Sequence, residues 1–331
     1  MATIYEVSKL AGVSLATVSR VMNKNAKVSD KTRKKVEAAM AELGYKPNSI
    51  AQSLASKRSS SVGVLVSELH GPFYGIMMSG IEKELRKAHK HVIIAAGHSE
   101  EDYEKESIEF LISRKCDALI LHVEAVSDEY LINLCKGDLP VIILNRFIPE
   151  IKDRCIGVDN EYGGYIAAKH IVDLGHRNIA YIAGPKWKRD SSDRLKGHKR
   201  ALEEAGIEFD EQLIYEGSFL SEAGRDGLQY FVSTNKPFSA IICANDEMAS
   251  GAIQEARSHN FNVPENLSIM GFDNISFTDY MYPKLCTVDN PVNEIGKMAA
   301  QWVLNSTYNA KHTIKHLYKP TLIIRDSAKK L

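Results

Sequence analysis

Two short stretches near the N-terminus arrange their apolar residues with the period of an α-helix. Apolar side chains recur at every third position over residues 4–10 and again over residues 18–21. Gly12 permits a tight turn between the two stretches, and Ser14 is a natural N-cap for the second helix. A third helical pattern follows over residues 29–43. We therefore predict a three-helix unit containing a helix-turn-helix, whose second helix fits the major groove of DNA.

The charge of the chain is divided unevenly between this unit and the rest. Residues 1–60 contain 11 of the 42 basic residues and 4 of the 42 acidic ones, which makes this segment about +7 and the remainder about −7. A basic segment on an acidic body is typical of a DNA-binding module. The charge therefore argues against the alternative, a generic helical hairpin.

The segment after the predicted bundle has a weaker pattern. Residues 45–48 break helical structure, and residues 49–56 are compatible with a helix of only eight residues, which is marginal in water. We expect a hinge over residues 46–60 that becomes helical only when something packs on it. A plain flexible linker is the alternative.

From residue 62 onward, strand-like apolar runs alternate with amphipathic helical stretches. Continuous apolar strands in such an alternation are typical of parallel sheets covered on both faces. The series breaks near Asp159 and restarts, which predicts two similar α/β lobes with a ligand cleft between them. We expect strands at residues 62–66, 92–96, 118–121, 141–144, 179–182, 240–243 and 267–270. The helices between them are expected at 75–88, 103–113, 163–174, 194–205, 222–232 and 247–259, and residues 291–304 and 320–324 are expected to return to earlier elements.

Composition narrows the class of protein. The chain is 44% apolar and 25% charged, and no apolar run approaches the ~20 residues of a membrane span, so we expect a cytoplasmic protein without a signal peptide. The five cysteines are scattered and form no Cys/His cluster, which predicts reduced thiols and no metal site. Because the sequence contains no Gly-rich phosphate loop or nucleophile elbow, we expect neither a cofactor nor an enzyme.

Several motifs, in order along nearly the whole chain, resemble those of the lactose-repressor family of bacterial transcription regulators. They include AGVSxxTVSRV at residues 11–21, AELGYKPN at 41–48, ANDxMAxGA at 244–252 and GFD at 271–273. The resemblance implies an all-α helix-turn-helix head and an α/β body with two parallel-sheet lobes of the periplasmic-binding-protein type. The expected boundaries are 1–45 for the head, 46–60 for the hinge and 61–331 for the effector-binding and dimerisation domain, with an N-lobe at about 61–159 and 291–319 and a C-lobe at about 160–290 and 320–331.

The same resemblance implies a function. A homodimer is expected to bind a palindromic operator in double-stranded DNA and to repress transcription until a small-molecule effector releases it. Residues 145–149, 154–156 and 320–322 resemble galactose-responsive members, which indicates D-galactose as an inducer. The alternatives are a repressor for another sugar, a glucoside or a purine, a sugar-binding transport component, and an enzyme that uses Asp246 and Asp273 as an acid–base pair.

The expected DNA contacts lie in the head and the hinge. Leu15 and Ala16 begin the second helix and suit thymine methyl groups, while Arg20 on the same face is a candidate for guanine or, alternatively, for a phosphate. We expect phosphate contacts from Thr3, Tyr5, Thr17, Ser19, Asn23 and Thr32. In the family a hinge leucine wedges into the minor groove, and the matching residue here is Leu54, with Ala51 and Ala55 permitting close approach.

The expected effector contacts lie at the ends of predicted strands. Asp273 is the candidate to accept hydrogen bonds from sugar hydroxyls, and Arg194 is similar to the family's ligand-binding arginine. The other candidates are Asn145, Asn245, Asp246 and Asn290, with Phe219 for stacking, Phe73 and Tyr74 for the opposite wall, and His98 where some relatives carry arginine. Three have alternative roles, because Asp246 fits a helix N-cap, Phe219 fits the core, and Asn145 or its neighbour Arg146 fits a salt bridge across the lobes.

Overall fold

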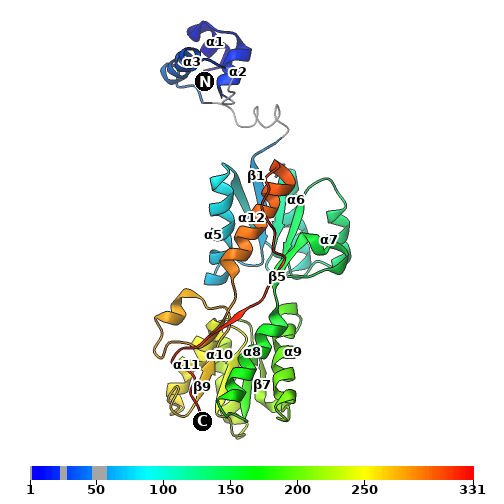
Figure 1. The fold of residues 1–331 in the computed structure, drawn as a ribbon, viewed down its shortest axis with the longest axis vertical. Coiled ribbons are helices and arrows are strands. Elements are labelled where there is room, and N and C mark those ends of the chain that lie inside the picture. Colours follow the sequence, from blue (N-terminus) through cyan, green and yellow to red (C-terminus); the bar gives the residue numbers. More distant parts are fainter. Residues whose placement is uncertain (1, 23–27, 47–57) are drawn as a thin grey trace. The chain divides into compact units, whose positions relative to one another are not determined.

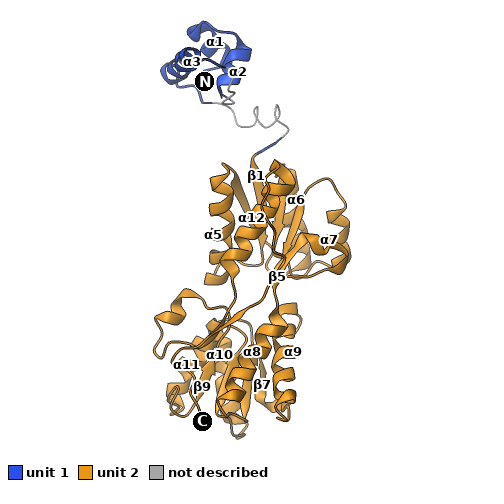
Figure 2. Cartoon of the chain, in the orientation of Figure 1, with its two compact units in different colours: residues 1–59 blue, residues 60–331 orange. Residues whose placement is uncertain are grey.

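A computed structural model describes residues 2–22, 28–46 and 58–331 of the chain (Figure 1). The chain divides into two compact units, residues 1–59 and residues 60–331 (Figure 2). Each unit has a hydrophobic core of its own.

The first unit is a bundle of three helices: α1 (Ile4–Ala11), α2 (Leu15–Met22) and α3 (Asp30–Glu42). One fully buried valine from each helix closes the core, namely Val7, Val18 and Val36. Gly12 ends α1 with a φ of 63°, a left-handed conformation that glycine adopts without steric cost, and the Ser14 side chain caps α2. The predicted helix-turn-helix is therefore confirmed.

The second unit begins with a parallel six-stranded sheet in the order β11-β5-β4-β3-β1-β2. Its strands are β1 (Ser61–Val66), β2 (His91–Ala96), β3 (Ala118–Leu121), β4 (Val141–Leu144), β5 (Cys155–Val158) and β11 (Leu317–Tyr318). One face is covered by α5 (Pro72–Lys87) and α12 (Val292–Tyr308), and the other by α6 (Glu101–Ser113) and α7 (Asp128–Cys135). Because both faces are covered, β3 and β4 are buried along their whole length, which explains their unbroken apolar sequences.

A second lobe repeats this plan with a parallel sheet in the order β7-β6-β8-β9. Its strands are β6 (Ile179–Ala183), β7 (Ile214–Glu216), β8 (Ala240–Cys243) and β9 (Ser268–Met270). Its helices are α8 (Asn160–Asp173), α9 (Arg189–Glu204), α10 (Ser221–Ser233) and α11 (Asp246–Ser258). An antiparallel pair, β10 (Thr287–Asp289) and β12 (Thr321–Ile323), extends the lobe beyond β9. The predicted fold class, a helical head with two parallel-sheet lobes, is confirmed.

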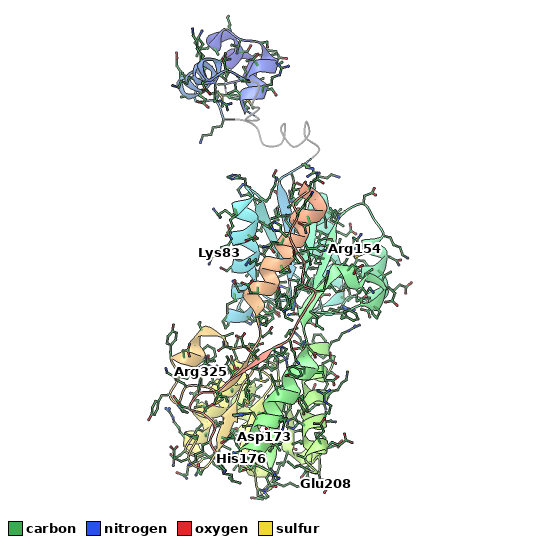
Figure 3. All side chains as sticks on the ribbon, in the orientation of Figure 1. Lys83, Arg154, Asp173, His176, Glu208 and Arg325 are labelled. Atoms are coloured by element: carbon green, nitrogen blue, oxygen red, sulfur yellow. The ribbon has the colours of Figure 1, made fainter. Side chains whose placement is uncertain are left out.

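The chain passes between the lobes three times, after β5, after β10 and after β11 (Figure 1). The second passage returns α12 to the first sheet, and the third places the C-terminal residues on the second lobe. There, Arg325 Nη2 donates to Asn274 Oδ1 at 2.7 Å, and a ring nitrogen of His176 lies 3.1 Å from the Lys329 carbonyl oxygen (Figure 3). The last residues are thus fastened to the C-lobe.

Several helices begin earlier than the pattern predicts, and the difference bears on the cavity at α8 and α9. We expected helices from residues 163 and 194, but α8 begins at Asn160 and α9 at Arg189. The side chain of Asp159 caps α8 by accepting the Tyr162 N–H at 2.9 Å. Helix α7 and the short strands β5, β7, β10 and β11 were not predicted. Within the described residues, no helix combines the length and the apolar character needed to span a bilayer.

Candidate effector cavity and DNA-binding surface

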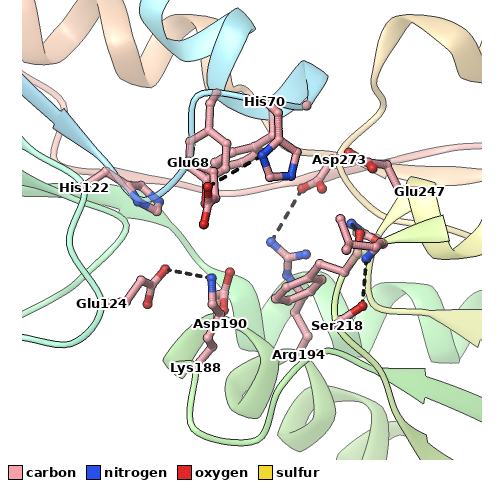
Figure 4. Close-up of a pocket in the computed structure, with 16 residues that line it drawn as sticks. Glu68, His70, His122, Glu124, Lys188, Asp190, Arg194, Ser218, Glu247 and Asp273 are labelled. Atoms are coloured by element: carbon pink, nitrogen blue, oxygen red, sulfur yellow. Dashed lines mark hydrogen bonds and ion pairs between the residues drawn. The ribbon is translucent and has the colours of Figure 1, made fainter. Parts of the chain in front are cut away.

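A cavity of about 120 Å³ lies between the two lobes, where the carboxyl ends of their strands face each other (Figure 4). Ligands of open α/β sheets bind at this edge. Six segments line the cavity: parts of residues 68–74, 122–124, 188–194, 218–220 and 245–247, and Asp273. The volume limits the ligand to a small molecule.

Arg194 and Asp273 form a buried charged pair at the wall of this cavity (Figure 4). Arg194 Nη2 lies 3.5 Å from Asp273 Oδ1, and Arg194 Nε donates to Asn160 Oδ1 at 2.9 Å. The guanidinium lies 3.7 Å from the centroid of the Phe272 ring, which fixes its plane. Asp273 Oδ1 also accepts from Asn290 Nδ2 at 3.0 Å. A ligand therefore meets a donor and an acceptor that the protein already holds in place.

The backbone conformation and the pKa of Asp273 are both unusual, as is common at functional sites. Its φ of 110° is one that L-residues rarely adopt, and such strain gathers at ligand sites. Burial raises the pKa of Asp273 to about 6, although the neighbouring Arg194 charge partly opposes this rise. The carboxylate is therefore ionised at neutral pH and becomes protonated in mildly acidic solution.

Ligand binding through Asp273 is expected to weaken as the pH falls through 6. A pKa raised to about 6 leaves only about a tenth of this carboxyl ionised at pH 5, so the affinity should fall about tenfold between pH 7.5 and pH 5. Calorimetric titration of the protein with its ligand at pH 7.5 and at pH 5 measures this change in affinity. Burial also raises the pKa of Glu124 to about 7, so this cavity carboxyl titrates in the same pH range as Asp273. The titration is therefore repeated with the Glu124→Gln variant, in which Glu124 no longer contributes. An affinity that does not change in either protein would contradict a role for the ionised Asp273.

The N-lobe contributes an aromatic wall. The rings of Phe73 and Tyr74 meet edge to face with centroids 5.2 Å apart, and the Tyr74 and His122 centroids are 5.5 Å apart. Burial lowers the pKa of His122 to about 4, so this ring is neutral at physiological pH. His122 Nδ1 lies 3.2 Å from the Ser67 hydroxyl. This wall offers apolar surface together with a neutral imidazole.

The C-lobe contributes Phe219 and Asn245. Phe219 has a φ of 70°, and its ring lies so close to Gly184 that a Cβ there would come within 2.2 Å of it. Asn245 Nδ2 donates to the Phe219 carbonyl oxygen at 2.8 Å, while Asn245 Oδ1 caps α11 by accepting the Met248 N–H at 3.0 Å. Phe219 is half-buried: it borders the cavity and also packs against the hydrophobic core of the C-lobe.

Several charged residues that line the cavity were not among the predicted effector contacts. Lys188 Nζ reaches across the lobes to Glu124 Oε1 at 3.9 Å (Figure 4). His122 and Glu124 follow directly after β3, so the same strand-end reasoning that selected Asp273 could have found them. Asp190 was missed because α9 starts earlier than predicted. The other ionisable side chains that line the cavity are Glu68, His70 and Glu247.

Four predicted residues do not line this cavity. Asp246 points into the C-lobe, where its carboxylate accepts from the Thr287 hydroxyl at 2.6 Å and the Ile275 N–H at 2.9 Å; the N-cap of α11 is Asn245. Asn290 lies behind Asp273 and supports it. His98 is half exposed and lies 3.3 Å from Glu68, and Asn145 lines a second cavity.

An ion pair joins the lobes beside the cavity. Asp128 is bound at 2.7 Å by Arg146 from its own lobe and at 2.7 Å by Arg189 from the other. We expected Asn145 or Arg146 as the alternative source of a salt bridge across the lobes. Arg146 instead pairs with Asp128 within the N-lobe, and Arg189 of the C-lobe forms the ion pair that joins the two lobes.

In the first unit, Ala16 and Arg20 lie exposed on α2, and Leu15 and Ser19 beside them are half-buried. Tyr5 is 69% exposed. Three of the predicted phosphate contacts already have intramolecular partners, because Thr3 forms a capping box with Glu6, Thr17 Oγ1 lies 2.9 Å from Ser14 Oγ, and Thr32 Oγ1 lies 2.9 Å from Ser29 Oγ. Asn23, Ala51, Leu54 and Ala55 lie outside the described residues.

Comparison with known families identifies the class of this protein. Residues 3–48 match the family described as "Bacterial regulatory proteins, lacI family", and residues 168–328 match "Periplasmic binding protein-like domain". A helix-turn-helix head and a two-lobed body in this order are the parts of a DNA-binding transcription regulator. The chain belongs to the lacI family of bacterial regulatory proteins.

Individual relatives match over nearly the full length. The HTH-type transcriptional regulator GalR of Escherichia coli (strain K12) is 34% identical over 328 residues, covering 99% of this chain and 96% of that protein. The ribose operon repressor of Haemophilus influenzae is 33% identical, covering 99% and 98%. The structure of the lac repressor dimer bound to operator and the anti-inducer ONPF superimposes with a TM-score of 0.89 at 28% identity, covering 99% of both chains. All three relatives are named as regulators or repressors.

Proposed function

We propose that this chain is a transcriptional repressor that binds a palindromic operator as a homodimer and releases it when D-galactose enters the cavity. The observation that carries the proposal is the Arg194–Asp273 pair, a preorganised donor and acceptor beside the Phe219 ring in the cavity between the lobes. Polar groups of this kind bind sugar hydroxyls, and an aromatic ring packs on the apolar face of a sugar. The similarity to GalR supports galactose as the sugar.

Release of the operator would follow from a shift in the equilibrium between two arrangements of the lobes. A ligand can move this equilibrium only if it binds one arrangement more tightly than the other. The effector contacts residues of both lobes, so it is expected to favour one spacing of the lobes and, through the hinge, one spacing of the two DNA-binding heads. An inducer favours the arrangement with the lower operator affinity.

A second candidate is a repressor of the same kind with a different effector. The ribose operon repressor is almost as similar to this chain as GalR is, so the identities do not separate the two sugars. A thermal-shift panel of D-galactose, D-glucose, D-ribose, cellobiose and hypoxanthine tests the choice, because a ligand raises the melting temperature by binding the folded state. Stabilisation by D-galactose alone is the expected result. Stabilisation by another compound, with none from D-galactose, would contradict the assignment.

Arg20 is proposed to read a guanine in the operator. Replacing it with glutamine should weaken specific binding by about 10- to 100-fold, because a bidentate arginine–guanine contact is worth roughly 1–3 kcal/mol. Binding to non-operator DNA should change little. Anisotropy titrations over a range of salt concentrations measure both, with Lys169→Gln in the second unit as the charge-matched control. Equal weakening on both DNAs, with a salt slope smaller by about 1, would show that Arg20 contacts a phosphate instead.

The hinge is proposed to act through Leu54. By its resemblance to the family, this side chain would insert into the minor groove and make binding sensitive to how easily the central step deforms. Ala51 and Ala55 would permit the close approach of two such hinges.

A further inference from the structure

The chain enters the second unit through a residue that several hydrogen bonds fasten to the N-lobe. Ser60 is the last residue of the predicted hinge and the first of the second unit. Its N–H donates to Asp117 Oδ2 at 2.9 Å, its carbonyl oxygen accepts the His91 N–H at 3.0 Å, and its hydroxyl accepts from Lys90 Nζ at 3.3 Å. Its φ of 55° is one that a serine rarely adopts, and such a conformation persists only where its surroundings hold it. Ser60, which we call the base of the hinge, is therefore fixed on the first sheet.

The carboxylate oxygen that holds the base of the hinge also binds the last residue of α12. Tyr308 Oη donates to Asp117 Oδ2 at 2.6 Å. Lys90 Nζ, which reaches Ser60, lies 3.9 Å from the centroid of the Tyr308 ring. A hydrogen bond from a hydroxyl to a carboxylate is about twice as strong as a neutral one, and the lysine charge is attracted to the face of the ring. Asp117 and Tyr308 thus join Ser60 to the C-terminal end of α12.

The other end of α12 lies at the effector cavity. Asn290, two residues before α12, donates through Nδ2 to Asp273 Oδ1 at 3.0 Å, and its carbonyl oxygen accepts the Val292 N–H at 2.7 Å. The 17 residues of α12 cover about 25 Å, at about 1.5 Å per residue. Figure 1 shows α12 running from the crossover between the lobes to the end of the N-lobe where β1 begins. One helix therefore connects the neighbourhood of Asp273 with that of Ser60.

Tight packing makes α12 a rigid connection. Two glycines bring α12 and α5 close together, because a Cβ at Gly296 would collide with the Met77 carbonyl oxygen and one at Gly80 with the Asn293 carbonyl oxygen. The buried face of α12 belongs to the core of the N-lobe. Helices packed in this way shift as a body, since a close-packed interior does not deform continuously. A displacement at the start of α12 would therefore also move Tyr308 at its end.

We propose that Asp117 and Tyr308 are positioning residues for operator binding, which fasten the base of the hinge to α12 and so connect it to Asp273. The proposal rests on the proposed function, because it assumes that a ligand in the cavity alters operator binding. It assigns the response of the hinge to two residues that do not line the effector cavity. Lys90 supports them through its contacts with both Ser60 and Tyr308.

Removing the Tyr308 hydroxyl tests this connection in the full-length protein. In Tyr308→Phe, calorimetry should show that D-galactose binds as it does in the unaltered protein. The ratio of the operator Kd values with and without the sugar should nevertheless fall by about tenfold, the lower limit for one hydrogen bond to a charged group. Asp117→Asn should lower this ratio as well, because it removes the charge that both donors share. Tyr215→Phe, which removes the hydroxyl of a half-buried tyrosine of the C-lobe, is the matched control.

Hydrogen exchange measures the same connection without any sugar, because the coupling between two binding sites is reciprocal. The probe is a palindromic galactose-type operator, bound to the full-length protein. Operator binding should slow the exchange of the backbone amides in residues 289–296, at the start of α12. This slowing should occur in the unaltered protein and in Tyr215→Phe, and it should be absent from Tyr308→Phe.

The outcomes separate this proposal from the proposed function. If D-galactose releases the operator from Tyr308→Phe as readily as from the unaltered protein, the role of Tyr308 is overturned and the galactose assignment stands. If D-galactose releases the operator from neither protein, the galactose assignment falls and hydrogen exchange decides the role of Tyr308. Slowing that is lost in Tyr308→Phe and kept in Tyr215→Phe supports that role. An exchange pattern that is the same in Tyr308→Phe and the unaltered protein overturns it.

Discussion

Replacing Asp273 with asparagine is expected to abolish the response to the effector while operator binding persists. Asparagine has nearly the same shape, but it removes the negative charge that faces Arg194 at 3.5 Å and accepts from Asn290 at 3.0 Å. A hydrogen bond to a charged group is worth about 1.5–3 kcal/mol, so the effector concentration needed for release should rise by about 10- to 150-fold. The change is measured as the midpoint of release of a labelled operator.

Asp173→Asn is the matched control for this variant, because Asp173 lies exposed on α8 outside the cavity and its replacement removes the same charge (Figure 3). The control should respond to effector as the unaltered protein does. Circular dichroism checks that both variants are folded. A normal response in Asp273→Asn would remove Asp273 from the site.

Replacing Gly164 with alanine is expected to destabilise the C-lobe. Gly164 of α8 lies so close to α9 that a Cβ would come 2.0 Å from the Arg194 carbonyl oxygen and 2.8 Å from the Arg194 Cα. The two helices would have to separate, and overpacking of this kind costs about 3 kcal/mol. Because the clash falls on the backbone of Arg194, the effector affinity should fall as well. Urea unfolding and calorimetric titration measure the two effects.

Gly75→Ala in α5 is the control for this substitution. Nothing lies within 4 Å of a Cβ at Gly75, so alanine there should stabilise the helix, by up to about 1 kcal/mol. If Gly164→Ala were as stable as Gly75→Ala, the close packing of α8 on α9 would be contradicted.

The lobes and much of the cavity were predictable from local patterns. Buried parallel strands read as unbroken apolar runs, and residues just after such runs must gather at one sheet edge. This reasoning selected Asp273 and Asn245, which line the cavity, and it applies equally to His122 and Glu124, which were not predicted; Phe219 was selected only by its resemblance to the family.

Other features depend on contacts that no local pattern contains. Asp246 follows a strand as Asn245 does, yet its carboxylate turns inward because Thr287, 41 residues later, passes beside it on β10. Asn145 also ends a strand, but the course of β5 and β11 beside it places its side chain in the second cavity. Arg189 reaches Asp128 only because the two lobes face each other. The direction of a side chain at a strand end is therefore set by elements that are distant in sequence.

The most direct test of the account is a fluorescence anisotropy titration on a labelled palindromic galactose-type operator. The bound protein is titrated with D-galactose at fixed salt, since phosphate contacts make operator affinity strongly salt-dependent. D-glucose serves as the comparison sugar. The account predicts that D-galactose lowers the anisotropy to that of free DNA, that D-glucose does not, and that Asp273→Asn stays bound throughout. Operator binding that D-galactose leaves unchanged would contradict the assignment of the cavity to this sugar.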